Sequence, residues 1–567
     1  MSIFDTAFLS NIQFLTFFKL ADAAYIDPLT SIENQWDTFI VPSVASRYVD
    51  DFFISESNSR AVAATFIDTS DQIITISFRG MDNAQDLFDV VNLLPGLDNY
   101  ITAFDELLQS VASLILNNAS YAGYKLWITG HSFGGAAVNQ LRDIAASSYG
   151  GVYEDATFVA FESPVIATRS DGIFNFGHEN DWVFKTVDRI IIPAIGVSHQ
   201  ELNFENTTDN VVRFDDSYQG VNVLFDPTDL STHDRRSILD TLERIRSSEF
   251  YHLMDEDSTI IVDASLGEVS DPGRQTQVSA QGHTAPRFFL GDYVADEISG
   301  GARLDYIEGR SGNDVLRGGA GADVIYGGMD NDEIFGDGTL LGLLDGNDEL
   351  RGGEGDDVIY GGGGNDRIYD GNGFDVVQAG AGNDIIYGGD DFYDIDAGAG
   401  NDTIFGGIGF GAAGGSTGND TIYGGAGGGI IYGGAGTDVM YGGSEAMIIA
   451  GQQDMDRMWG GGEDQLRDSF IYYESTDSSP GRVDNIMDFE KEFDVIDVDL
   501  VDANQIAAGR QDFRFIGQSN SGVLGDLWYR VVGVDCLVRG NTDRDAAPEL
   551  EIRVRNVTAL DIADFLI

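Results

Sequence analysis

GGEGDDVIY, residues 352–360, is followed without a gap by GGGGNDRIY, residues 361–369, and both fit the pattern G-G-x-G-x-D-x-U-x, in which U is an apolar residue. The same period of nine recurs from about residue 305 to about residue 462. Such repeats form a parallel β-roll, because the glycines make tight turns and the apolar residue faces inward. A flexible glycine-rich linker would not repeatedly place an apolar residue two positions after an aspartate. The repeats therefore predict an all-β parallel β-roll.

The aspartate of each repeat predicts a calcium ligand, because Ca²⁺ prefers carboxylate and carbonyl oxygens. One turn of a two-sided roll takes two repeats, so aspartates that are two repeats apart stack on the same edge. The predicted ligands of the roll are Asp314, Asp323, Asp332, Asp348, Asp357, Asp366, Asp375, Asp384, Asp402, Asp420, Asp438 and Asp456.

The two edges of the predicted roll differ in their carboxylates. One edge carries an aspartate at every turn from Asp348 to Asp456. The other edge carries Asp357 and Asp375, and its next positions are Tyr393, Gly411, Gly429 and Met447. We expect a full calcium ladder on the first edge and a metal-poor second edge beyond Asp375. The longer spacing between Asp332 and Asp348 predicts a loop that bulges out of the roll.

The charge balance is strongly acidic, since 94 Asp and Glu residues against 32 Lys and Arg residues give a net charge of −62. This excludes nucleic acid and anionic membranes as main partners and favours calcium ions. We expect residues 305–465 to be largely disordered until calcium neutralises their carboxylates. A single cysteine, Cys536, excludes an intramolecular disulfide. The N-terminus lacks a basic region and an apolar core typical of a cleaved signal, so we expect secretion without one.

Composition divides the chain into four predicted parts. Residues 1–275 alternate β-branched and aromatic runs with helical stretches, which predicts an α/β domain. Residues 276–304 are polar and predict a linker, residues 305–465 form the roll, and residues 466–567 form a β-rich C-terminal cap. The sequence contains no run of about 18 apolar residues, so it predicts no membrane-spanning helix.

The sequence KLWITGHSFGG, residues 125–135, places Ser132 between a predicted strand and a predicted helix, with glycines two residues to either side. This is the pattern of a nucleophile elbow, in which a serine sits on a sharp turn that only small neighbours allow. Backbone amides must stabilise the oxyanion that forms. We expect one from Phe133 and a second from Gly80 or Met81, which follow the strong strand at residues 72–78.

The base for Ser132 must be one of six histidines: His131, His178, His199, His233, His252 and His283. In an elbow hydrolase the base follows both the nucleophile and the acid in the chain. Its place in a loop before a predicted helix favours His233, and His199 is the alternative. No H-E-x-x-H motif surrounds any of them, which excludes a metalloprotease of that kind.

The acid that orients the histidine should follow a strand between Ser132 and His233. Residues 172–177 predict such a strand, and Asp181 follows it. Asp181 is therefore the first candidate, with Glu179 and Asp188 as alternatives.

The N-terminal part closely resembles the calcium-dependent lipases of Gram-negative bacteria that carry repeats-in-toxin (RTX) modules and leave the cell by type I secretion. The motifs GHSFGGAAVN, FVAFESP, NFGHENDWVF, ENTTDNVVRF and SSEFYHLMDEDSTIIV occur in the family's order over about residues 70–265. The resemblance implies an α/β-hydrolase fold in which Ser132, Asp181 and His233 are nucleophile, acid and base.

The same resemblance implies two further calcium sites, one at Asp209 and one in a lid at Asp82 and Asp86. The stretch from Arg79 to Ser132 is shorter than in those lipases, so we expect a reduced or different lid. The tail DSFIYYESTDSSPGRVDNIMDF and the final DFLI resemble the C-terminal domain and secretion signal of serralysin proteases, which implies export by a type I secretion apparatus.

These features predict an extracellular serine lipase or esterase that acts on lipid or ester substrates at a lipid–water interface through an acyl-enzyme. A phospholipase A1 would use the same triad and is the nearest alternative. A calcium-binding surface or adhesive protein with a decayed hydrolase domain is the alternative from another class.

Overall fold

The computed structural model of the chain describes residues 20, 37–49, 52–54, 62–79, 101–131, 133–161, 174–178, 210–214, 245, 247–250, 253, 260–263, 287–291, 293, 295–301, 304–337, 346–391, 393–409, 411–462, 465–520, 522–545 and 547–567. The chain divides into two compact units, Met1–Leu290 and Gly291–Ile567. Each unit is described by itself.

The first unit is built on a mixed sheet whose neighbouring strands follow one another in the chain. The first strands pair antiparallel, and each pairing from β5 onward is parallel. The short β1 (Asp37–Thr38) pairs antiparallel with β4. The other strands are β2 (Tyr48–Val49), β3 (Phe52–Ile54), β4 (Val62–Asp68), β5 (Ile73–Phe78), β6 (Lys125–His131), β7 (Thr157–Phe161), β8 (Phe174–His178), β9 (Asn210–Phe214), β10 (Ile260–Asp263) and β11 (Arg287–Leu290).

Helices cover this sheet and form its core with β4 to β7. The helices whose bounds are described are the α-helices α3 (Asp105–Asn117) and α4 (Phe133–Ile144) and the 3₁₀ helices η1 (Pro42–Arg47) and η3 (Tyr149–Gly151). Helix α3 is amphipathic because Leu107, Leu108 and Val111 recur at helical spacing, and it buries these residues in the core. Among the described residues no helix has the length and hydropathy to cross a bilayer. The parallel strands and helices confirm the predicted α/β domain.

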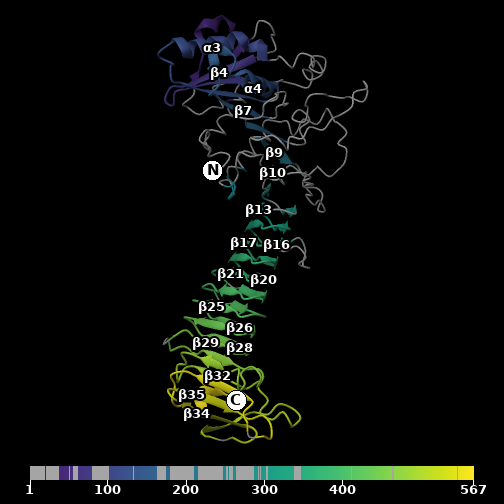
Figure 1. Cartoon of the computed structure of the whole chain (residues 1–567), viewed down its shortest axis with the longest axis vertical. Helices are drawn as coiled ribbons and strands as arrows, with labels where there is room; N and C mark the ends of the chain where they lie inside the picture. The colour runs from purple at the N-terminus through teal and green to yellow at the C-terminus, as the bar shows by residue number, and fades with distance from the viewer. Residues whose placement is uncertain are drawn as a thin grey trace, which may run out of the picture. The chain divides into compact units, whose positions relative to one another are not determined.

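The second unit begins as a parallel β-roll with two sheets (Figure 1). Strands of odd number form one sheet and strands of even number the other, on opposite sides of the stack. The first sheet contains β13 (Asp305–Ser311), β15 (Val324–Met329), β17 (Glu349–Glu354), β19 (Arg367–Asn372), β21 (Ile385–Tyr387), β23 (Thr403–Phe405), β25 (Thr421–Gly425), β27 (Val439–Gly443) and β29 (Arg457–Trp459). The second contains β12 (Glu297–Gly301), β14 (Val315–Gly319), β16 (Glu333–Asp337), β18 (Val358–Gly363), β20 (Asp375–Ala381), β22 (Tyr393–Ala399), β24 (Gly411–Gly414), β26 (Gly429–Ala435) and β28 (Met447–Gln453).

Each repeat contributes one inward apolar residue to the core of the roll, as its pattern predicts. Ile368, Ile386 and Ile404 lie fully buried on one sheet, opposite Ile359 and Ile395 on the other. The following residue faces outward, and on the first sheet these residues form a continuous stack of rings: Tyr369, Tyr387, Phe405, Tyr423, Tyr441 and Trp459, with neighbouring centroids 4.5 to 5.1 Å apart.

The two sheets of the roll continue into the C-terminal cap. Strands β30 (Ser469–Ile471), β32 (Val495–Asp497) and β37 (Phe565–Leu566) extend the second sheet in parallel, with η8 (Ile562–Asp564) before β37. The first sheet continues through β31 (Asp484–Ile486) to β36 (Leu550–Val554), β35 (Asp535–Gly540), β34 (Asp526–Val532) and β33 (Arg514–Gln518). The roll also starts inside the segment predicted to be a linker, because β12 pairs with β14. Roll and cap thus share their sheets.

Candidate functional site

The predicted nucleophile elbow falls at a change from strand to helix. Strand β6 ends at His131 and helix α4 begins at Phe133, so Ser132 alone separates the two elements in the sequence. Ser132 itself lies outside the described residues. A single residue between a strand and a helix requires a sharp turn, which is the context that the motif needs.

Two glycines let the elements around this turn approach one another closely. A Cβ built on Gly130 would lie 2.5 Å from the carbonyl carbon of Gly134. A Cβ built on Gly134 would collide with the carbonyl oxygen of Phe78 and lie 2.6 Å from its carbonyl carbon. Both obstacles are backbone atoms, which cannot rotate away as a side chain can. The glycines of the motif are therefore required by packing at both positions.

Parallel pairing brings the ends of β5 and β6 to the same edge of the sheet, with Phe78 opposite Gly130. Gly80 and Met81 follow β5 directly in the sequence and lie outside the described residues. The amide of Phe133 belongs to the first turn of α4, whose N–H groups have no partner within the helix. An amide at this position is available to a developing oxyanion.

The remaining predicted residues of the catalytic unit, Asp181, His233, Asp82, Asp86 and Asp209, lie outside the described residues. The alternatives Glu179, Asp188 and His199 do so as well. The strand expected before Asp181 at residues 172–177 is present as β8.

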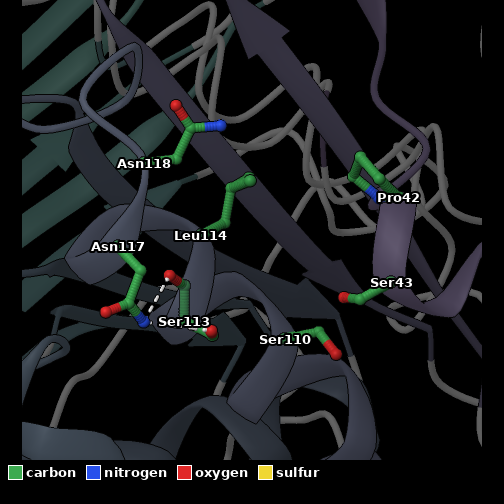
Figure 2. A pocket seen from close by; sticks show the side chains of 7 residues that line it. All are labelled: Pro42, Ser43, Ser110, Ser113, Leu114, Asn117 and Asn118. Carbon is green, nitrogen blue, oxygen red and sulfur yellow. Dashed lines mark hydrogen bonds between the residues drawn. The ribbon is translucent and has the colours of Figure 1, made fainter.

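A shallow pocket of about 210 Å³ lies between η1 and α3 (Figure 2). Pro42 and Ser43 line it from η1, and Ser110, Ser113 and Leu114 line it from α3. The amide of Asn117 donates a hydrogen bond of 3.1 Å to the carbonyl oxygen of Ser113 at its rim. None of the predicted catalytic residues lines this pocket.

The aspartates of the first edge of the roll form a hydrogen-bonded ladder. Oδ1 of Asp366 accepts a hydrogen bond of 2.9 Å from the backbone N–H of Asp348, 18 residues earlier. The same bond recurs at every turn with lengths of 2.8 to 2.9 Å as far as Asp456. One oxygen of each carboxylate thus fixes the stacking of successive turns.

The second oxygen of these carboxylates is buried and accepts no hydrogen bond from the described residues. This holds for Oδ2 of Asp348, Asp366, Asp384, Asp402, Asp420, Asp438 and Asp456. Burial raises the pKa of Asp348 to about 7 and that of Asp366 to about 8. Leaving a carboxylate oxygen buried and bare is costly, so each of these groups needs a proton or a cation.

The surroundings of Oδ2 fit a calcium ion. A Cβ built on Gly361 would lie 2.6 Å from Oδ2 of Asp366 and would also touch the carbonyl oxygen of Ala379. Both oxygens can only accept hydrogen bonds, so the space that they share favours a hard cation. Ca²⁺ takes 6 to 8 such oxygens at about 2.3 to 2.6 Å. The residues present thus fit the ion that the repeats imply.

The predicted register of two repeats per turn is confirmed. Partners in neighbouring turns are two repeats apart, as in Tyr306 opposite Val324 and Ile368 opposite Ile386. Across the insertion the offset is longer, with Ile325 opposite Leu350. The insertion thus adds seven residues without disturbing the ladder, although residues 338–345, predicted as the bulging loop, lie outside the described residues.

The second edge loses its carboxylates where the sequence predicts. Asp375 pairs in register with Tyr393, and the next positions are Gly411, Gly429 and Met447. The buried Tyr393 ring lies where a Cβ on Gly411 would stand, and its hydroxyl donates a hydrogen bond of 3.2 Å to the carbonyl oxygen of Gly424. Met447 also approaches Gly424, since a Cβ built on Gly424 would lie 2.9 Å from Cε of Met447. Side chains fill this edge from Tyr393 to Met447.

Sequence reasoning missed five aspartates that extend the two ladders. The N–H of Asp296 donates to Oδ1 of Asp314, and the N–H of Asp305 donates to Oδ1 of Asp323. Asp296 and Asp305 each precede the next ladder aspartate by nine residues, and this spacing could have revealed both. At the other end the N–H of Asp456 donates to the carboxylate of Asp484, 28 residues later. The N–H of Met447 donates to the carboxylate of Asp468, and the N–H of Asp468 to that of Asp494, over offsets of 21 and 26 residues. No periodicity signals these offsets.

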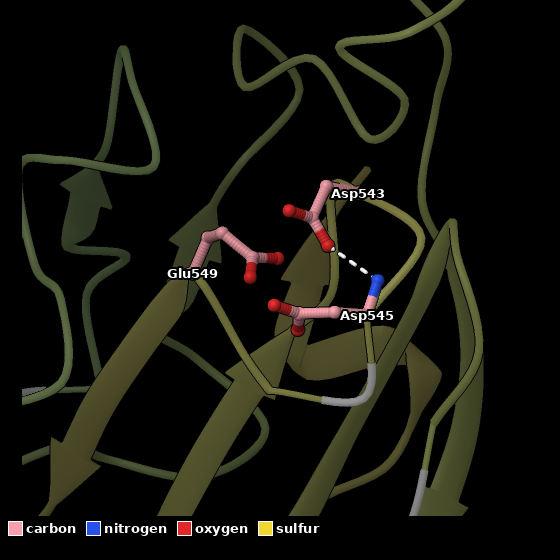
Figure 3. A group of neighbouring side chains, drawn as sticks. All are labelled: Asp543, Asp545 and Glu549. Carbon is pink, nitrogen blue, oxygen red and sulfur yellow. Dashed lines mark hydrogen bonds between the residues drawn. The ribbon is translucent and has the colours of Figure 1, made fainter.

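A separate group of carboxylates, Asp543, Asp545 and Glu549, lies in the loop between β35 and β36 (Figure 3). Oδ1 of Asp543 accepts a hydrogen bond of 2.7 Å from the N–H of Asp545, and Oε2 of Glu549 accepts one of 2.7 Å from the N–H of Thr542. These bonds within the loop account for its shape.

Comparisons with known proteins agree with the two parts of the chain. The family of the RTX calcium-binding nonapeptide repeat matches residues 290–323, 308–338, 344–369, 361–392, 394–411 and 414–446. The roll therefore consists of calcium-binding RTX repeats.

Two lipases from Pseudomonas fluorescens are similar to this chain. One is 36% identical over 200 residues, which cover 33% of this chain and 43% of the lipase. The other is 35% identical over 201 residues, covering 32% and 41%. The chain thus aligns with less than half the length of these curated relatives. The extracellular lipase LipA of Serratia marcescens matches over 100% of both chains at 18% identity, with a TM-score of 0.47. The repeats and the sequence likeness confirm the predicted resemblance to RTX lipases.

Proposed function

We propose that this chain is a calcium-dependent, extracellular lipase or esterase that hydrolyses carboxylic esters of lipids through a Ser-His-Asp triad. The observation that carries the proposal is the close approach between the end of β6 and the start of α4, where Gly130 packs against the backbone of Gly134 and Gly134 against the carbonyl of Phe78. These two glycines flank Ser132 in the sequence. Likeness to two lipases supports the choice of ester hydrolysis.

In the proposed reaction Ser132 attacks the ester carbonyl while His233 takes its proton, and Asp181 holds the resulting imidazolium. The oxyanion of the tetrahedral intermediate receives hydrogen bonds from the amide of Phe133 and from that of Gly80 or Met81. His233 then returns the proton to the leaving alcohol. Water attacks the acyl-enzyme in a second, equivalent step that frees Ser132.

We assign catalysis to the first unit, and to the roll and cap the roles of calcium-dependent folding and of export by a type I apparatus. Calcium bound in the roll supplies the charge that its buried carboxylates lack. In the catalytic unit Asp209, Asp82 and Asp86 are proposed to hold further calcium ions. Extracellular calcium modules bind the ion at about 10⁻⁴ to 10⁻³ M, which suits a roll that folds after it leaves the cell.

The test is turnover of a series of chromogenic esters with short and long acyl chains, together with a triglyceride and a phospholipid, in saturating calcium. Ser132→Ala should abolish turnover of every substrate, while Ser147→Ala, an exposed serine beyond α4, should retain it. Release of fatty acid mainly from the phospholipid would identify a phospholipase A1. Absence of turnover by the parent protein would favour the surface-protein alternative.

A further inference from the structure

Asp370 stands at a position of the repeat that its neighbours fill with glycine. The repeats that contain Asp357 and Asp366 begin with Gly352 and Gly361, whereas the next repeat, which contains Asp375, begins with Asp370. The side chain of Asp370 is fully buried, with 0% of its surface exposed. A buried carboxylate that replaces a turn glycine demands a compensating partner.

Among the described residues, the carboxylate of Asp370 has a hydrogen bond only to a neighbouring residue. Oδ1 accepts the N–H of Gly371 at 2.7 Å. Oδ2 is buried and accepts no hydrogen bond from any described residue, and no lysine or arginine among the described residues pairs with it. Burial and then the nearby charge of Asp375 raise the pKa of Asp370 to about 8.

Asp370 lies between two successive turns of the second edge. Its carbonyl oxygen faces the turn of Asp357, because a Cβ built on Gly352 would touch that oxygen and lie 2.5 Å from Oδ2 of Asp357. Its side chain faces the following turn, because a Cβ built on Gly389 would lie 3.2 Å from Oδ1 of Asp370. The residue thus offers oxygens on both of its sides.

The second-edge ladder is interrupted after this turn, and the next carboxylate on this edge is that of Asp468. Oδ1 of Asp375 accepts the N–H of Asp357 at 2.8 Å, and the next aspartate position is occupied by Tyr393. The turn after Asp375 therefore cannot supply the carboxylate that a regular repeat would bring. Asp370 places a carboxylate between the same two turns.

We propose that Asp370 is an additional ligand of a divalent cation, with calcium as the natural ion, held together with Asp375 where the second-edge ladder is interrupted. The carboxylate of Asp370 replaces the one that is missing from the position of Tyr393. This site does not depend on the proposed hydrolase activity, because it lies within the roll.

The experiment counts calcium ions bound to the full-length protein. Asp370→Asn keeps the shape of the side chain and removes its charge, and Asp370→Gly restores the residue that neighbouring repeats carry, so the turn can still fold. Asp394→Asn removes an exposed carboxylate of β22 and is the matched control. Native mass spectrometry in calcium chloride counts the ions of the folded form, and anomalous diffraction locates them.

Both Asp370 variants should lose one ion relative to the parent protein, with loss of the anomalous peak beside Asp375 and retention of the peaks along the first edge. Asp394→Asn should keep the parent number. The proposal is overturned if either Asp370 variant keeps every ion of the parent protein, or if Asp394→Asn loses an ion as well.

Discussion

Removal of calcium should unfold the roll at neutral and alkaline pH but not at acidic pH. Burial raises the pKa of Asp348, Asp357 and Asp420 from 3.8 to about 7 in the folded chain. A carboxyl group whose pKa is higher in the folded state stabilises the fold below its unfolded pKa, and this stability is lost as the pH rises through the folded pKa. The calcium-free roll should therefore gain stability as the pH falls from about 8 to about 4.

The magnitude follows from the size of the shift. A rise of about three pKa units corresponds to about 4 kcal/mol for each carboxylate that must ionise in the fold. Solvent screens part of this penalty, and three such groups would still cost on the order of 10 kcal/mol, which is comparable to the whole stability of a typical domain, about 5 to 15 kcal/mol. The ladder holds more than three such groups, so we expect the ionised, calcium-free roll to unfold. Calcium removes this penalty because the cation takes the place of the proton.

The assay is circular dichroism of the full-length protein after chelation, with the pH lowered in steps and calcium then restored. The near-ultraviolet signal of the stacked rings from Tyr369 to Trp459 reports on the roll itself, because these rings stack only when successive turns are in register. We expect this signal to vanish at about pH 8 in chelator and to return on acidification or on addition of calcium. A signal that survives chelation at alkaline pH, or that acid in chelator fails to restore, would refute the reasoning.

Three further predictions concern single residues. His233→Ala should lower turnover about as much as Ser132→Ala, on the order of 10⁶-fold, while His199→Ala should have little effect; the reverse result in ester hydrolysis would make His199 the base. Gly134→Ala should destabilise the first unit by about 1 to 3 kcal/mol in thermal unfolding and lower kcat, because its Cβ meets the backbone of Phe78; an unchanged melting temperature would contradict this packing. Tyr393→Ala should cost about 3 kcal/mol or more in calcium-saturated denaturant unfolding, whereas Tyr393→Phe, which loses only the bond to Gly424, should cost about 1 kcal/mol; equal losses would mean that the ring does not fill the edge.

The strand register of the roll and the face on which each residue lies could be predicted from the sequence almost position by position, because a fixed period determines both. The offset of two repeats between stacked partners and the change at Tyr393 both follow from counting. Counting fails where the period changes length, as between Asp456 and Asp484, which are 28 residues apart. There the ladder is maintained by hydrogen bonds between segments whose spacing carries no signal.

The catalytic unit was predictable to a different extent. The elbow is local, so its strand, helix and glycines are all contained in residues 125–144. The contact that makes Gly134 necessary is not local, because Phe78 is distant in sequence and meets it only after β5 and β6 have paired. The acid and the base are predicted in loops, where no periodicity restricts the choice among candidates. The position after a predicted strand therefore made Asp181 only the first of three candidates, and the family resemblance added the further support.

Successive turns of the roll are held together by different interactions at its two edges. On the first edge each turn brings a carboxylate, and the stack is complete only when a cation compensates the buried charge. On the second edge Tyr393 fills the space with a ring, and this requires a residue without a side chain at Gly411, because any Cβ there would overlap the ring. The two substitutions are therefore coupled, since a ring at position 393 excludes the regular aspartate at the stacked position of the next turn. It follows that this part of the folded second edge is held by apolar packing and needs no cation of its own, while the first edge and the site at Asp370 depend on the ion.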